Sequence, residues 1–246
     1  MVFKDWNGRV LSSKTYHYGN KVTAPANPTR AADETYTYTF IGWDKEIVSC
    51  TGNAVYTAQY QAIEKLNGWV SKDGKWYYYI DNVAQIGWEQ VSGKWYYFNS
   101  NGIMQTGWMK SGNVWYYLQP SGAMATGWEQ VSGKWYYFGN SGAMTTGWLK
   151  LGNTWYYFNN GGAMTTGWLQ LANTWYHFNN GGAMTTGWLQ LGNTWYYFND
   201  GGAMTTGWLK LGNTWYYFND GGAMTTGWLL LGNTWYYFNN SGAWVS

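Results

Sequence analysis

The sequence predicts an all-β repeat protein, a β-solenoid of stacked hairpins preceded by a small β-rich module. Three observations lead to this prediction. Gly-Trp occurs nine times between residues 68 and 236, each time followed after six residues by Trp-Tyr, and from Gly87 onward the spacing is 20 residues. A pair typical of a tight turn lies inside each unit, and no segment has a strong helical period. A unit this short cannot bury an apolar face alone, so we expect the units to stack.

The composition excludes several functions. Charged residues make up 11% of the chain, with 14 Lys and Arg against 12 Asp and Glu, so there is no basic patch for nucleic acid or an anionic membrane. Aromatic residues make up 22%, including 21 tryptophans, far above ordinary globular usage. Some of these rings are therefore expected to do more than fill a core.

One cysteine, Cys50, excludes an internal disulfide framework and is either a buried thiol or an exposed reactive one. No apolar run is long enough for a signal peptide or a membrane span. We expect the chain to be a fragment of a longer protein, extracellular and associated with the cell wall, whose signal peptide is absent from this sequence.

The first 60 residues do not follow the repeat. Residues 2–6, the turn Asn7-Gly8 and residues 9–11 predict a hairpin, a Pro-containing stretch at 23–30 interrupts regular structure, and residues 35–41 and 54–60 predict further strands. This pattern, with Phe40-Ile41-Gly42-Trp43-Asp44, resembles the internalin B-type repeat of bacterial surface proteins. The resemblance implies a β-grasp-like stalk or adhesive module at 1–61, with 62–66 as linker and the nine-hairpin solenoid at 67–246.

Residues 147–158 illustrate the repeat. A two-residue loop at Gly152-Asn153 would pair Leu149 with Tyr156 and Trp148 with Tyr157. Because side chains alternate along strands, one face would carry Leu149, Leu151, Tyr156 and Phe158, and the other Trp148, Lys150, Trp155 and Tyr157. We expect the first face to be the interior of the stack.

The tryptophan face predicts a binding site. The position of Lys150 is mostly polar in other units, so both tryptophans would lie beside water. Two tryptophans, a tyrosine from the next hairpin and a methionine floor would form an aromatic cage for a quaternary ammonium group. Three rings contribute roughly 3–4 kcal/mol, an affinity near the millimolar range, so multivalency would have to supply the rest.

The motif Gly-Trp, Trp-Tyr-Tyr-Phe, Gly-Ala-Met-Thr-Thr resembles the choline-binding, or cell-wall-binding, repeats that attach bacterial and phage proteins to choline-decorated teichoic acid. The resemblance implies cages made of the two tryptophans of one hairpin and the second tyrosine of the next. These are Trp69, Trp76 and Tyr97; Trp88, Trp95 and Tyr117; Trp108, Trp115 and Tyr137; Trp128, Trp135 and Tyr157; Trp148, Trp155 and His177; Trp168, Trp175 and Tyr197; Trp188, Trp195 and Tyr217; Trp208, Trp215 and Tyr237. The floor methionines would be Met104, Met124, Met144, Met164, Met184, Met204 and Met224.

Four departures from the pattern carry expectations. His177 in place of tyrosine is expected to weaken the fifth cage, more so at acidic pH. Ala84 replaces the first methionine, which puts the floor of the first cage in doubt. Trp244 takes the next methionine position, so the last hairpin would be a cap or an interface, with dimerisation through it left open. Glu89 and Glu129 replace leucine on the interior face, so those two hairpins are expected to be wetter.

Three alternatives remain beside the cage. The rings could be only an aromatic core, or the array could bind glucan or another glycan by stacking on sugar rings. An enzyme has little support, since the only histidines are His17 and His177 and no nucleophile, base and orienter grouping or metal-ligand spacing occurs. We therefore expect no catalytic residues, no metal and no cofactor, and a choline-bearing polymer as the partner.

Overall fold

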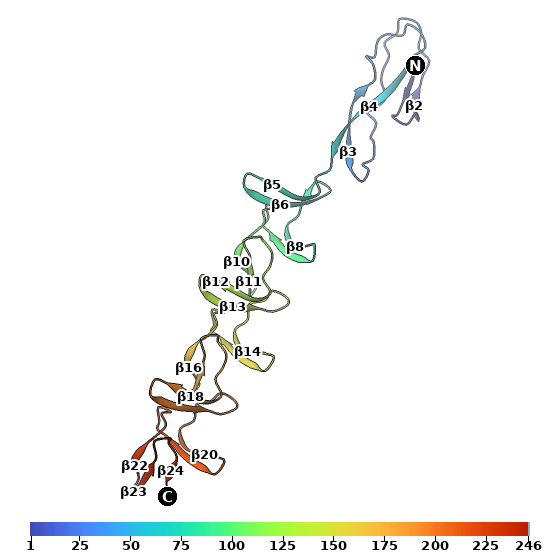
Figure 1. Ribbon diagram of the computed structural model, residues 1–246. Coiled ribbons are helices and arrows are strands. Elements are labelled where there is room, and N and C mark those ends of the chain that lie inside the picture. The colour runs from blue at the N-terminus through green and yellow to red at the C-terminus, as the bar shows by residue number, and fades with distance from the viewer. Residues whose placement is uncertain (246) are drawn as a thin grey trace. The chain divides into compact units, whose positions relative to one another are not determined.

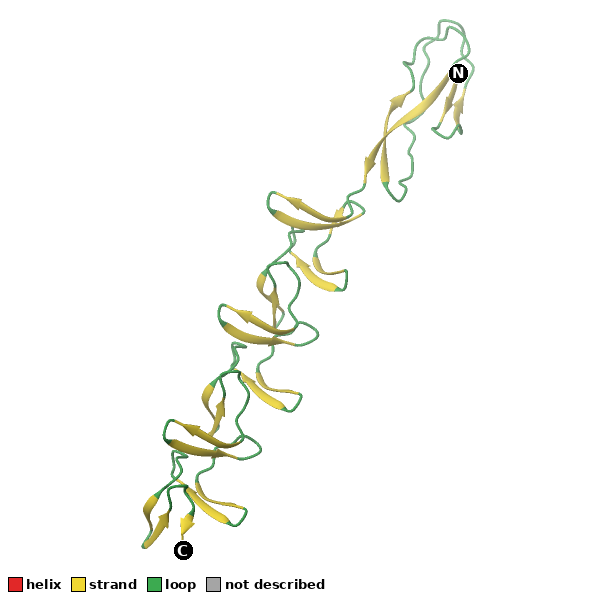
Figure 2. Cartoon of the chain, in the orientation of Figure 1, coloured by secondary structure: helices red, strands yellow, loops and turns green. Residues whose placement is uncertain are grey.

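The computed structural model describes residues 1–245, in which every regular element is a β-strand (Figures 1 and 2). The chain divides into two compact units, Met1–Val91 with Tyr96–Gln105, and Ser92–Trp95 with Thr106–Ser246. The predicted fold class, an all-β array of repeated hairpins behind a small β module, is confirmed.

The N-terminal module in the first unit is a four-stranded sheet with strand order β2-β1-β4-β3. Its strands are β1 (Val2–Lys4), β2 (Val10–Ser13), β3 (Tyr36–Trp43) and β4 (Val55–Glu64). β1 runs antiparallel to β2 and parallel to β4. The predicted hairpin and both later strands are present, although a register shift between Phe3 and Lys4 makes the turn around Asn7-Gly8 longer than two residues.

A small aromatic core holds this module together. Phe3 stacks on Tyr56 with ring centroids 4.8 Å apart, and Val22 and Cys50 complete the buried cluster. Of the two alternatives for the single cysteine, the buried thiol is confirmed. Asp5 is also buried, but it accepts hydrogen bonds from the Tyr60 hydroxyl and the Arg9 guanidinium, so its charge is compensated.

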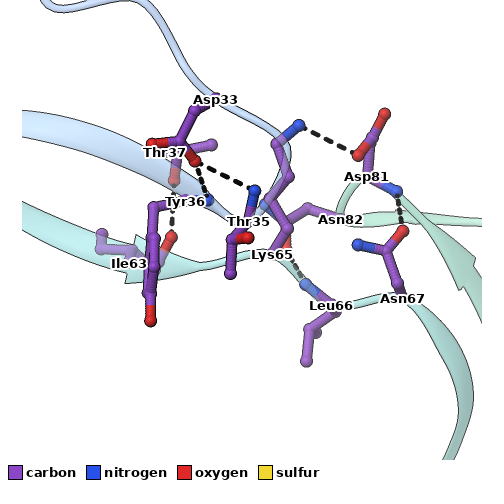
Figure 3. Close-up of polar contacts among 10 residues, drawn as sticks. All are labelled: Asp33, Thr35, Tyr36, Thr37, Ile63, Lys65, Leu66, Asn67, Asp81 and Asn82. Carbon is purple, nitrogen blue, oxygen red and sulfur yellow. Dashed lines mark hydrogen bonds and ion pairs between the residues drawn. The ribbon is translucent and has the colours of Figure 1, made fainter.

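The module joins the first hairpin through polar contacts rather than a free linker (Figure 3). The segment 62–66, expected to be a linker, is strand up to Glu64. The Lys65 ammonium then lies 3.0 Å from the Asp81 carboxylate, the Leu66 amide donates to the Asn82 side chain, and the Asp81 amide donates to the Asn67 side chain. The backbone of residues 65–67 is thus tied to the turn that joins β6 to β7.

Nine antiparallel hairpins follow in the described chain. β5 (Gly68–Lys72) pairs with β6 (Lys75–Ile80), which also pairs with β7 (Val83–Ala84), and β8 (Gly87–Val91) pairs with β9 (Lys94–Phe98). The remaining hairpins are β10–β11 (Gly107–Ser111, Val114–Leu118), β12–β13 (Gly127–Val131, Lys134–Phe138), β14–β15 (Gly147–Leu151, Thr154–Phe158), β16–β17 (Gly167–Leu171, Thr174–Phe178), β18–β19 (Gly187–Leu191, Thr194–Phe198), β20–β21 (Gly207–Leu211, Thr214–Phe218) and β22–β23 (Gly227–Leu231, Thr234–Phe238), with β24 (Trp244–Val245) added to the last.

The predicted register is observed in β5–β6 and in every hairpin from β10–β11 to β22–β23. In β14–β15, Leu149 pairs with Tyr156 and Trp148 with Tyr157, leaving a two-residue loop. The loop of the β16–β17 hairpin has positive φ at both residues, 44° at Ala172 and 66° at Asn173, the geometry of a type I′ turn. Most other repeats have Gly at the first of these positions, where a positive φ is free of strain.

The loop that follows each hairpin joins it to the preceding one. After β17, Met184 forms a β-bridge with Phe178 of its own hairpin, while its amide donates to the Trp155 carbonyl of β15 at 2.8 Å. The same bond recurs from Met204 to Trp175 and from Met224 to Trp195. This hydrogen bond pairs a carbonyl on the edge of the hairpin that would otherwise have no backbone partner. The loop after one hairpin therefore covers an edge of the hairpin before it.

The buried core of the array is a set of large apolar residues, one from the end of the second strand of each hairpin except the first. They are fully buried, with 0% exposure, and comprise Phe98, Leu118, Phe138, Phe158, Phe178, Phe198, Phe218 and Phe238. The predicted interior face is therefore confirmed at Phe158, whereas Leu149, Leu151 and Tyr156 are only partly buried. Tyr156 contacts Trp128 of the preceding hairpin, with ring centroids 5.0 Å apart.

Candidate functional site

An open cavity lies between hairpin β14–β15 and the two repeats that follow it. It has a volume of 330 Å³ and is lined by Trp148, Trp155, Tyr176, Met184 and Gly201. The two indoles are 6.1 Å apart and almost perpendicular, at 88°, so they form two adjacent walls. Tyr176 supplies a third, with its ring 5.1 Å from that of Trp148.

The first tryptophan is held rigidly while one side stays open. Trp148 contacts Tyr157 of its own hairpin at 5.2 Å and the buried Phe178 of the next at 5.8 Å. Such edge-to-face packing fixes the indole plane. Even so, Trp148 and Trp155 both keep 38% of their surface exposed, so the alternative that the rings are only an aromatic core does not account for them.

The same cavity recurs along the second unit. Trp108, Trp115, Tyr136, Met144, Asn160 and Gly161 line one of 390 Å³, and Trp188, Trp195, Tyr216, Met224 and Ser241 line one of 340 Å³. The ring arrangement repeats at Trp128 with Tyr156 and at Trp168 with Tyr196, each pair 5.0 Å apart. In the first unit, Trp69 lies 6.3 Å from Trp76 and 4.7 Å from Tyr96.

The third wall is the first tyrosine of Trp-Tyr-Tyr, not the second as the family resemblance implied. The rings that approach the tryptophans of the preceding hairpin are Tyr96, Tyr136, Tyr156, Tyr176, Tyr196, Tyr216 and Tyr236. The second tyrosines instead pack against the first tryptophan of their own hairpin, as Tyr97 does on Trp88, Tyr117 on Trp108, Tyr137 on Trp128, Tyr157 on Trp148, Tyr197 on Trp188, Tyr217 on Trp208 and Tyr237 on Trp228.

The difference arises from the direction of successive hairpins. Figure 1 shows β12, β14 and β16 pointing to different sides of the second unit. The face of one hairpin that carries Leu169 and Tyr176 therefore meets the tryptophan face of the hairpin before it. Strand alternation determines which residues share a face, but not which face the neighbouring hairpin contacts.

The methionines are also displaced by one unit from the expected grouping. Met184, not Met164, lines the cavity of Trp148 and Trp155. The Met164 amide donates to Trp135, and the amides of Met104, Met124, Met144, Met184, Met204 and Met224 donate to Trp76, Trp95, Trp115, Trp155, Trp175 and Trp195. The first cage consequently has Met104 beside it, so Ala84 does not leave it without a methionine.

Most of the methionines pack against a glycine. A Cβ built on Gly202, whose φ is +76°, would lie 2.3 Å from the Met184 sulfur, and Gly162, Gly182, Gly222 and Gly242 stand in the same relation to Met144, Met164, Met204 and Met224. The thioether thus packs directly on backbone, which only glycine permits. The second Gly of Gly-Gly-Ala-Met, 18 residues after each methionine, is the sequence signal that indicates this contact.

His177 is outside the cavity in which it was expected. Its ring packs on Trp168 at 5.2 Å, its Nδ1 lies 3.0 Å from the Thr185 hydroxyl, and it is 9% exposed. Burial lowers the pKa of His177 below its ordinary value of 6.5, so the imidazole is held in the neutral form. The fifth cage has Tyr176 as its third wall and is complete without His177.

The last hairpins depart from the pattern as the sequence suggested. Trp244 pairs with Phe238 as the methionines pair with their phenylalanines, and its ring lies 6.1 Å from Trp208. Trp208, Trp215, Tyr236 and Trp244 therefore meet at one place. Trp228 and Trp235, in the last hairpin of the described residues, are 68% and 61% exposed.

Glu129, one of the two acidic residues on the expected interior face, accepts a hydrogen bond from the Gln119 side chain at 2.8 Å. Residues 1–245 hold no group of three or more metal-ligating side chains. No helix in this described part of the chain is long and apolar enough to cross a membrane. The cavities themselves are lined by aromatic, methionine and small uncharged residues, a surface that suits an apolar cation or a ring face rather than a metal.

The chain is similar to a known repeat family and to solved structures. The family described as "Choline-binding repeat" matches residues 85–127, 125–168, 165–206 and 205–246, and "Putative cell wall binding repeat" matches residues 67–82. Among solved structures, CbpJ from Streptococcus pneumoniae is 32% identical, with 86% of each chain covered and a TM-score of 0.66. Choline binding protein F from the same organism is 29% identical over 94% of this chain and all of that one, with a TM-score of 0.64. No curated protein matches the sequence.

The glycine packed on a methionine gives a first prediction. In Gly202→Ala the new methyl group would overlap the Met184 side chain, which is flexible and would leave its place beside Trp155. We expect the methyl resonance of Met184 to lose its aromatic ring-current shift in methionine-methyl NMR. Gly192→Ala is the matched control, since its φ is +61° and nothing lies within 4 Å of the added Cβ. An unmoved Met184 resonance in Gly202→Ala would contradict the packing.

The buried His177 gives a second prediction. Because the pKa of His177 is lowered in the folded state, the unfolded chain binds a proton more readily, and stability should fall as pH drops from about 6.5, the unfolded value, through the lower folded one. His177→Tyr, which restores the residue found in neighbouring repeats, should remove this loss. Thermal midpoints of both proteins between about pH 7.5 and 5 measure it; equal losses in the two proteins would rule out His177 as the cause.

Proposed function

The chain belongs to the choline-binding repeat family, and on that premise we propose that it is a non-catalytic attachment module that holds its parent protein on cell-wall teichoic acid by binding choline. The ligand group is the trimethylammonium head of choline, and the binding elements are the aromatic cavities between successive hairpins. The binding residues are two tryptophans of one hairpin, the first tyrosine of the next and the following methionine.

The single observation that carries the proposal is the cavity of Trp148, Trp155, Tyr176 and Met184. A quaternary ammonium group is large, apolar at its surface and positively charged, so it loses little solvation on entering such a cage and is attracted by each ring quadrupole. The indole walls meet at 88°, which lets two ring faces approach one cation together. No buried counter-ion is required.

Repetition of the cavity supplies the affinity. One cage of three rings contributes on the order of 3–4 kcal/mol, a dissociation constant near the millimolar range. A polymer that carries many choline groups would engage several cages at once, and each further contact becomes intramolecular. A wall polymer bearing choline is therefore the partner that suits the array, rather than free choline.

The cellular context follows from this function. Choline-bearing wall polymers lie outside the membrane, so the module would act on the surface of a Gram-positive cell as part of a secreted protein. Its choline-binding relatives among solved structures come from Streptococcus pneumoniae. Any enzymatic activity would reside in other parts of the parent protein.

The ends of the chain have roles of their own in this proposal. The mixed sheet β2-β1-β4-β3 would serve as a stalk or adhesive module of the internalin B type. The exposed Trp228 and Trp235 of the last hairpin would bind a second copy. Sedimentation at several concentrations tests the second point, because a chain that stays monomeric throughout excludes such a dimer.

Tryptophan fluorescence titrated with choline tests the main proposal. We expect a saturable change with choline and with tetramethylammonium at millimolar concentrations, and none with glucose or sodium chloride. Tyr216→Ala should lower the number of choline sites found by equilibrium dialysis, since it removes one wall of a single cavity. Tyr18→Ala is the control, because Tyr18 is 82% exposed in the N-terminal module.

A response to glucose without one to either ammonium compound would favour the glycan-binding alternative and reject the choline proposal. An unchanged number of sites in Tyr216→Ala, with the choline response intact, would reject only the assignment of the first tyrosine.

A further inference from the structure

Three of the cages carry a lysine beside one of their walls. The ammonium groups of Lys110, Lys150 and Lys210 lie 5.8, 5.6 and 5.6 Å from the ring centroids of Trp115, Trp155 and Trp215. Each of these is the second tryptophan of its hairpin. Lys110 and Lys150 do not line the cavities of Trp115 and Trp155 themselves, so their charges lie next to the cages and leave the interior open.

These lysines have no acidic partner. The ion pairs of residues 1–245 are Arg9 with Asp5 and Lys65 with Asp81. The three ammonium groups are therefore free to meet an anion from outside the chain. At the same position other hairpins carry an uncharged residue, namely Gln130, Gln170 and Gln190.

A lysine in this place opposes the binding of a simple cation. The lysine ammonium and a bound onium group would be like charges near one indole, and like charges repel. The lysine instead favours binding of a ligand that carries an anion close to its quaternary nitrogen, because the mobile lysine side chain can then pair with that anion. The cages beside Lys110, Lys150 and Lys210 (the lysine cages) and those beside Gln130, Gln170 and Gln190 (the glutamine cages) thus suit different ligands.

We propose that Lys110, Lys150 and Lys210 are specificity-determining residues that recognise the phosphate of a phosphocholine group whose trimethylammonium occupies the adjacent cage. The lysine cages select zwitterionic head groups, and the glutamine cages accept the onium group irrespective of its anion. This inference rests on the proposed function, since it needs the cages to hold the ammonium.

Exchange of lysine and glutamine tests it with residues that the repeat already uses. The triple variant Lys110→Gln, Lys150→Gln, Lys210→Gln removes the three charges, and Gln130→Lys, Gln170→Lys, Gln190→Lys is the matched reverse. Calorimetric titrations with glycerophosphocholine and with tetramethylammonium supply the zwitterion and the bare cation. The informative quantity is the ratio of the two affinities in each protein.

We expect the first variant to bind glycerophosphocholine roughly twofold to fivefold more weakly than the wild type, with tetramethylammonium binding unchanged or tighter, and the reverse variant to change in the opposite sense. Raising sodium chloride to about 0.5 M should remove these differences, because exposed charges are then screened. An identical ratio in all three proteins would overturn the lysine assignment. Failure of the wild type to bind either ligand would instead overturn the proposed function.

Phosphocholine groups occur both on wall polymers and on phosphatidylcholine. Sedimentation with choline-bearing teichoic acid and with phosphatidylcholine vesicles separates the two sources. We expect retention on teichoic acid, reduced in the Lys110→Gln, Lys150→Gln, Lys210→Gln variant. Retention on vesicles alone would overturn the wall polymer as the source of the phosphate.

Discussion

The array depends on one contact, the packing of the first tryptophan of each hairpin against the next hairpin. Trp148 lies on Tyr176 and on the fully buried Phe178, and the Met184 amide bonds to the neighbouring Trp155 carbonyl. The same rings therefore provide the core between units and the walls of the cavity. A hairpin alone would have neither, because two strands bury too little surface to be stable in water.

This double use explains why the repeat is so uniform. A tryptophan that only filled a core could be exchanged for another apolar residue of similar volume. Here the indole must also present a ring face to the cavity at 38% exposure, which an aliphatic side chain cannot replace. Met184 is constrained in the same way, because its side chain packs against Gly202 and its amide donates to the Trp155 carbonyl. At the position of Lys150 the residue varies among repeats, while the tryptophans beside it do not.

Three departures from the repeat lie next to the first or second tryptophan of a hairpin. Lysine replaces glutamine beside the second tryptophan of some hairpins, His177 is buried against Trp168, and Trp244 takes the place of a methionine next to Trp208. None of these alters the hairpin register. They give the cages different surroundings, so an array of nearly identical repeats offers sites whose neighbouring side chains differ.

The sequence by itself determined the hairpins, their two-residue loops and the residues on each face, because strand alternation and turn chemistry act over a few residues. It also indicated the two tryptophan walls of each cavity, because the Gly-Trp and Trp-Tyr pairs recur at a fixed spacing. Only the tertiary structure decided that Tyr176 and not His177 faces Trp148, and that Met184 rather than Met164 belongs with Trp155. Those pairings depend on how one hairpin is rotated against the next, and that rotation results from the connecting loop and the packing of Phe178, contacts between units that no local pattern specifies.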